Sequence, residues 1–150
     1  MTDEKADARD ALAALQQTRN SLAASYDYPF ARHLAFGLLI GSFVAAQALP
    51  TGLRMGALGL ALAGIFLIQR WDRRRTGSFI NGYRPGATRK VTALLLLAVL
   101  PILVAAVVFG GPERPTLVVA LAGLATLVCI AFSYWWQAVY LRELGGEDAS

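Results

Sequence analysis

Residues 91–141 read VTALLLLAVLPILVAAVVFGGPERPTLVVALAGLATLVCIAFSYWWQAVYL and contain only two charged side chains, Glu113 and Arg114. Both lie in a short turn rich in glycine and proline, which ends helices. A membrane-spanning helix needs about 20 mostly apolar residues, because about 30 Å of hydrocarbon is crossed at about 1.5 Å per residue. Residues 91–109 and 115–141 meet this requirement. The sequence therefore predicts a hairpin of two transmembrane helices.

Another hairpin is expected on the N-terminal side of this one. Because it comes earlier in the chain, we call it the first hairpin and residues 91–141 the second. Residues 29–49 and 53–71 are also long enough and apolar enough to span a membrane, and a short Pro-Thr-Gly turn separates them. We therefore predict an all-α, polytopic membrane protein. Its transmembrane domain, residues 29–142, holds four helices arranged as two hairpins, which are joined by a basic loop at residues 72–90.

The overall composition agrees with this class of protein. Hydrophobic residues make up 56% of the chain and charged residues 16%, whereas soluble domains average about 45–50% and about 25%. A disordered chain and an ordinary soluble enzyme are thereby excluded. The lone cysteine, Cys129, excludes an internal disulfide and is expected to pack within the fourth helix. With one histidine, a His-rich metal site is impossible within one chain. No cofactor and no nucleic-acid partner are expected.

The basic residues predict the orientation in the membrane. Of 14 lysines and arginines, only Arg54 and Arg114 lie beside the two tight turns, and the other twelve lie on the opposite side. Lysine and arginine concentrate in cytoplasmic loops, so both termini and the middle loop are predicted to be cytoplasmic. The abundance of Arg, Ala, Gly and Leu favours a bacterial source, and hence the bacterial inner membrane. No cleavable signal peptide is expected, because the first 25 residues lack an apolar core.

The N-terminal segment, residues 1–28, is predicted to be a cytoplasmic amphipathic helix. Its apolar residues recur at helical spacing: Ala8, Ala11, Leu12, Leu15 and Leu22. This helix is expected to pack on the middle loop or on a partner. Residues 143–150 are expected to form a cytoplasmic tail.

Ionisable side chains inside a membrane usually mark an ion or substrate path. In this chain they lie near the ends of the apolar segments, which argues against a proton-coupled transporter. Arg32 and His33, near the start of the first segment, are expected to extend toward the interface. His33 could act as a general base beside Asp27, and an interfacial lipid enzyme is therefore a third-ranked alternative.

The middle loop is the most distinctive polar stretch. Basic residues beside an anionic leaflet contribute about 1 kcal/mol each, so this loop predicts a surface that binds anionic lipid or a partner. Ordinary positive-inside topology is the alternative explanation. The residues predicted to form this surface are Arg70, Arg73, Arg74, Arg75, Tyr83, Arg84, Arg89 and Lys90.

Small residues at helical spacing predict close helix packing, because they let two backbones approach each other. The simplest interpretation is that they seal the first hairpin. If one row faces outward, it would form the seam of a homo-oligomer or of a complex with a membrane partner. Pro101 is expected to kink the third helix. The small residues are Gly37, Gly41 and Ala45 in the first helix and Gly52, Gly56, Gly59 and Ala63 in the second.

These observations favour a non-catalytic function. We expect a small accessory, scaffold or regulatory subunit that docks a partner protein or anionic lipid through its basic cytoplasmic face. The alternative is an oligomeric channel or transporter for a neutral or lipophilic substrate, formed around Pro101 and Gln47.

Overall fold

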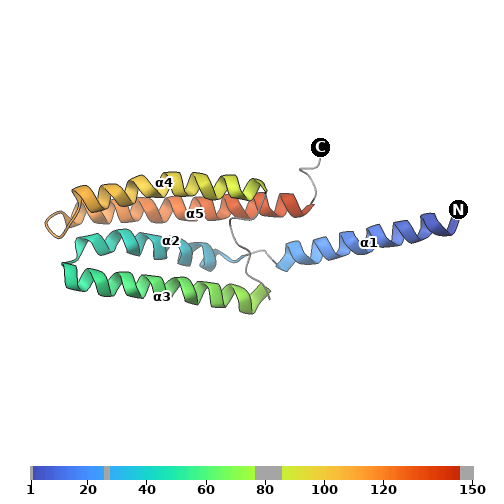
Figure 1. Ribbon diagram of the computed structural model, residues 1–150, viewed down its shortest axis with the longest axis horizontal. Coiled ribbons are helices and arrows are strands. Elements are labelled where there is room, and N and C mark those ends of the chain that lie inside the picture. Colours follow the sequence, from blue (N-terminus) through green and yellow to red (C-terminus); the bar gives the residue numbers. More distant parts are fainter. Residues whose placement is uncertain (1, 26–27, 77–85, 146–150) are drawn as a thin grey trace.

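The computed structural model describes residues 2–25, 28–76 and 86–145 (Figure 1). All of its elements are helices, which confirms the predicted all-α fold. In chain order they are α1 (Thr2–Ser25), α2 (Phe30–Ala45), the short 3₁₀ helix η1 (Ala46–Ala48), α3 (Thr51–Thr76), α4 (Ala87–Phe109) and α5 (Pro115–Gly145).

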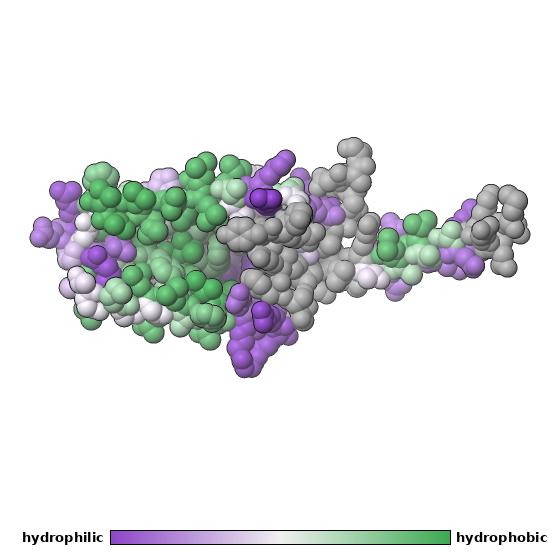
Figure 2. Space-filling model, viewed as in Figure 1, coloured by the Kyte–Doolittle hydropathy of each residue, from purple (hydrophilic) through white to green (hydrophobic). Residues whose placement is uncertain are grey.

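Within the described residues, four stretches are long and apolar enough to cross a membrane: Phe30–Ala48, Thr51–Arg74, Ala87–Phe109 and Pro115–Glu143. On the face shown in Figure 2, their surface is largely hydrophobic. Large apolar side chains are exposed along them, such as Leu60 at 77% and Leu97 at 70%. This surface suits contact with lipid rather than water, and the chain is a multi-pass membrane protein.

The two hairpins, α2–α3 and α4–α5, pack against each other through contacts between α2 and α5 (Figure 1). Helix α5 packs on both α2 and α4, whereas α3 packs mainly on α2. The helices therefore follow one another in the order α4, α5, α2, α3. As a result, only 6% of the apolar stretch of α3 is buried inside the molecule, against 33% of the stretch formed by α2 and η1.

Glycines allow α2 and α5 to approach closely. A Cβ atom added to Gly37 would lie 2.6 Å from Ile130 Cγ1 and 2.8 Å from the carbonyl oxygen of Thr126. A Cβ atom added to Gly41 would collide with the Thr126 hydroxyl. The prediction that this row seals the first hairpin is therefore wrong, because the row joins the first hairpin to the second. Ala45 packs on the adjacent buried core of Val44, Ala106, Ala122 and Ala125.

The row of small residues in α3 does not seal the first hairpin either. Added Cβ atoms at Gly52, Gly56 and Gly59 would meet nothing within 4 Å, and Ala63 is exposed. The close contact of α3 with α2 is made instead at Gly64, where an added Cβ would lie 2.7 Å from Leu39 Cδ1.

The helices extend further than hydropathy predicts. Helix α3 continues to Thr76 and α4 begins at Ala87, so both ends of the predicted loop 72–90 are helical. Helix α5 continues to Gly145, into the predicted tail. Pro101 lies within α4 and is exposed.

The predicted N-terminal helix is present as α1, which contacts α5 and extends away from the four spans (Figure 1). Leu12 and Leu15 on its apolar stripe are 64% and 53% exposed. The described part of that stripe is therefore not packed on the rest of the chain. Cys129 is buried within α5, as predicted.

Candidate functional site

We call the end of the molecule at which α3 ends and α4 begins the basic end. Its exposed cations, among the side chains that the structure describes, are Arg70, Arg73, Arg74, Arg89, Lys90 and Arg142. Figure 2 shows a strongly hydrophilic patch where α3 ends.

An open groove of about 650 Å³ lies along this end of α3. Its described lining residues recur at i, i+3, i+4, i+7 and i+8, so they occupy one face of the helix. Ligand sites commonly have volumes of about 300–1,000 Å³, and this groove lies within that range. The lining residues are Phe66, Gln69, Arg70, Arg73 and Arg74.

The groove contains three of the eight residues predicted to bind lipid or a partner: Arg70, Arg73 and Arg74. Arg89 and Lys90 are exposed in the first turn of α4 but do not line it. The Arg75 side chain, Tyr83 and Arg84 lie outside the part of the chain that the structure describes.

Sequence reasoning missed Phe66 and Gln69, because it looked for the surface in the middle loop and ended the helix at residue 71. The spacing of both residues from Arg70 and Arg73 could have identified them once α3 was continued by one more turn.

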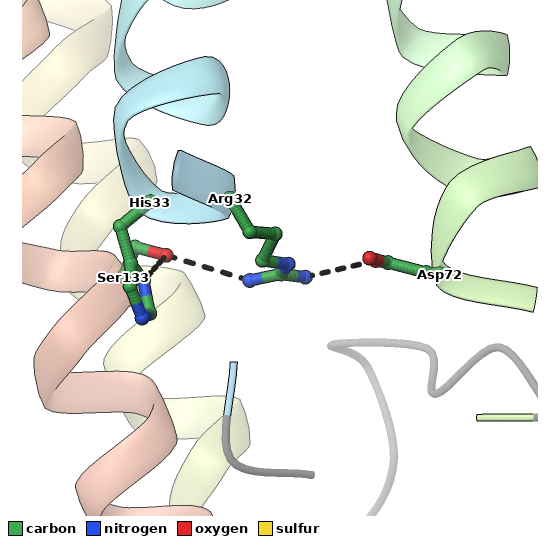
Figure 3. Close-up of polar contacts among 4 residues, drawn as sticks. All are labelled: Arg32, His33, Asp72 and Ser133. Atoms are coloured by element: carbon green, nitrogen blue, oxygen red, sulfur yellow. Dashed lines mark hydrogen bonds and ion pairs between the residues drawn. The ribbon is translucent and has the colours of Figure 1, made fainter. Parts of the chain in front are cut away.

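A buried polar network lies behind the groove and joins three helices (Figure 3). The Arg32 guanidinium on α2 pairs with the Asp72 carboxylate on α3 at 3.1 Å, and it donates to the Ser133 hydroxyl on α5 at 3.5 Å. The Asp72 side chain is only 4% exposed and that of Arg32 is 18% exposed. The guanidinium also lies 4.1 Å from the centre of the Tyr28 ring, a favourable cation–π contact.

His33 is fully buried, and the prediction that it extends toward the interface is wrong. Its Nδ1 atom shares a hydrogen bond with the Ser133 hydroxyl at 2.8 Å, and its ring stacks on Tyr134 with centroids 3.9 Å apart. The reason is that α2 packs against α5 at this level of the bundle, where Ser133 and Tyr134 supply internal polar and aromatic partners. Asp27, its proposed catalytic neighbour, lies outside the described residues.

A second polar contact fixes the start of α4 to the end of α5. The Glu143 carboxylate accepts hydrogen bonds from the backbone N–H groups of Ala87 and Thr88. These groups have no partner within their own helix, and a carboxylate is favoured at the positive end of the helix dipole. Gly86, immediately before the helix, has a φ of 144°, a conformation that favours glycine.

The arrangement suits anion binding. An arginine fork donates two parallel hydrogen bonds to a carboxylate or a phosphate, and the groove holds three such forks. Within the described ranges, no group of three or more His, Cys, Asp or Glu side chains is placed to hold a metal ion. Comparisons with protein-family models, curated proteins and solved structures gave no match.

Proposed function

We propose that this chain is a small, non-catalytic accessory, scaffold or regulatory subunit of the bacterial inner membrane, which docks a partner protein at its basic end. The observation that supports this proposal most strongly is the groove on α3. It presents Arg70, Arg73 and Arg74 together on one exposed helix face. The network of Arg32, Asp72 and Ser133 behind it gives that face a fixed position.

The proposal places the basic end and both termini in the cytoplasm. Twelve of the 14 basic residues support it by the positive-inside rule. The two exceptions have structural roles at the opposite end. Arg54 donates to the carbonyl oxygens of Gln47 and Leu49, at 3.3 and 3.1 Å, and Arg114 donates to that of Phe109 at 3.5 Å. Both arginines cap backbone carbonyl groups beside the tight turns. This structural role explains their presence at this end, whichever side of the membrane it faces.

The test is native mass spectrometry of the full chain, gently extracted from its own membranes. A second, different chain at a fixed stoichiometry is expected. The double variant R73Q/R74Q should lose that chain, because two of the three groove cations are removed. The matched control R89Q/K90Q removes the same charge from the same end and should keep it.

Two outcomes would contradict the proposal. One is a bare homo-oligomer that carries a small molecule, which would favour the channel or transporter. Solute flux through the pure protein in proteoliposomes would then establish that alternative. The other is retention of the partner by R73Q/R74Q, because docking at the groove requires these cations.

A further inference from the structure

The groove on α3 crosses from apolar to charged surroundings. Phe66, at one end, lies within residues 55–69 of α3, which carry no charge, and is 70% exposed. Arg73 and Arg74, at the other end, lie two turns further along α3. This separation is about 12 Å along the helix axis, at about 1.5 Å per residue. A molecule that fills the groove therefore contacts an aromatic ring at one end of the groove and guanidinium groups at the other end.

The positive charge of the groove is not neutralised by the part of its lining that the structure describes. Asp72 lies between the groove arginines in sequence, but its carboxylate faces Arg32 on α2. At about 100° per residue, the lining residues centre roughly 130° around the helix from Asp72. The acid therefore turns inward while Arg70, Arg73 and Arg74 turn outward, and no acidic residue belongs to the described lining. An anionic ligand is electrostatically complementary to this surface.

The apolar part of the groove identifies the kind of anion. A soluble phosphate would use the arginines and leave Phe66 without a ligand. A phospholipid supplies both a phosphate and an acyl chain. It also reaches the groove directly, because only 6% of the apolar stretch of α3 is covered by the rest of the molecule.

We propose that the groove is a binding site for one anionic phospholipid, with the headgroup phosphate on Arg70, Arg73 and Arg74 and an acyl chain against Phe66. This inference goes beyond the proposed function: it assigns a ligand to the same basic end, but it does not depend on a partner protein. Of the predicted basic surface, the proposed site keeps three cations and excludes Arg89 and Lys90. It also includes Phe66 and Gln69, which were not predicted.

The test is a lipid titration of the purified full-length protein in detergent, followed by native mass spectrometry. Phosphatidylglycerol and phosphatidylcholine of equal chain length are the probes. One phosphatidylglycerol is expected to bind in preference to phosphatidylcholine. R73Q/R74Q should weaken it roughly 10- to 30-fold, since each basic residue contributes on the order of tenfold or less. The control R89Q/K90Q should change the affinity by less than about twofold.

Phe66→Ala separates a lipid from a soluble anion. It should weaken the binding of phosphatidylglycerol by a few-fold, because an apolar contact with the acyl chain is lost. Inorganic phosphate at millimolar concentration should not displace the lipid. Far-ultraviolet circular dichroism checks that each variant is folded, and Arg70→Gln alone is a milder variant should the double one misfold.

Three results would overturn the inference. They are equal affinity for the two lipids, equal loss in R73Q/R74Q and R89Q/K90Q, and displacement by inorganic phosphate. The two proposals can be refuted independently. If the pure protein binds the lipid but no second chain co-purifies, only partner docking is refuted. If a second chain co-purifies but the pure protein does not bind the lipid, only the lipid site is refuted.

Discussion

The polar side chains at the basic end differ in burial, because some face outward and others face a neighbouring helix. Arg70 and Arg73 face outward, whereas Asp72 between them is buried against Arg32. Taking one partner from a buried ion pair is costly, because the remaining charge keeps its desolvation penalty. The Arg32–Asp72 pair is therefore expected to fix how α3 is rotated against α2.

Asp72→Asn should lower the stability of the protein by about 1–3 kcal/mol, below the 3–5 kcal/mol of fully buried pairs because Arg32 keeps some access to solvent. Arg32→Gln should have an effect of similar size. The double variant should cost less than the sum of the two, since the charge mismatch disappears. Thermal unfolding in detergent measures all three. Strictly additive losses would show that the two side chains are not coupled.

Single residues also mark where sequence reasoning stops. The pairing of His33 with Ser133 joins positions 100 residues apart, and no spacing in one sequence reveals it. Phe66 and Gln69 were missed because hydropathy ends the helix where charges begin. In the structure, the charged residues that follow Trp71 continue α3 to Thr76. One of them, Asp72, forms a buried ion pair with Arg32.

At the scale of elements, the two rows of small residues have different environments. Gly37 and Gly41 lie against α5, whereas Gly52, Gly56 and Gly59 on α3 have open space around them. Sequence spacing predicted that both rows pack against each other within the first hairpin, and this prediction is wrong for both. The helix that Gly37 and Gly41 face depends on the α2–α5 contact, which is made between the hairpins rather than within one.

Gly37→Ala and Gly59→Ala should therefore have opposite effects. At Gly37 the new methyl group would press on the backbone carbonyl of Thr126, which cannot rotate away, and we expect a loss of about 1–3 kcal/mol. At Gly59 the methyl group meets nothing, so the higher helix propensity of alanine should give a gain of up to about 1 kcal/mol. Unfolding of both variants in the same detergent compares them. A loss at Gly59 would show that this face of α3 packs on a second copy.

For the whole molecule, hydropathy was sufficient to predict four spans in two hairpins, because lipid requires long, uninterrupted apolar helices. It could not predict their lateral order. The observed order places α3 and α4 at the two edges, and the helix faces that they leave exposed are available to lipid and partners.

The proposed orientation gives a prediction for the intact protein. In a Cys129→Ala background, Glu113→Cys should react with a membrane-impermeant maleimide added to spheroplasts. Arg74→Cys should react only after the membrane is permeabilised. Both positions are exposed, so a difference in labelling would report the side of the membrane. The reverse pattern would place the basic end outside the cell.

The network of Arg32, His33 and Ser133 also has a consequence for biosynthesis. At about 5–20 residues per second, the ribosome adds Ser133 roughly 5–20 s after His33. During this interval the first hairpin exists without the partner that α5 provides. Its polar side chains must therefore stay hydrated, or be held by the insertion machinery, until the second hairpin enters. The order of translation thus makes α5 the element that completes the fold.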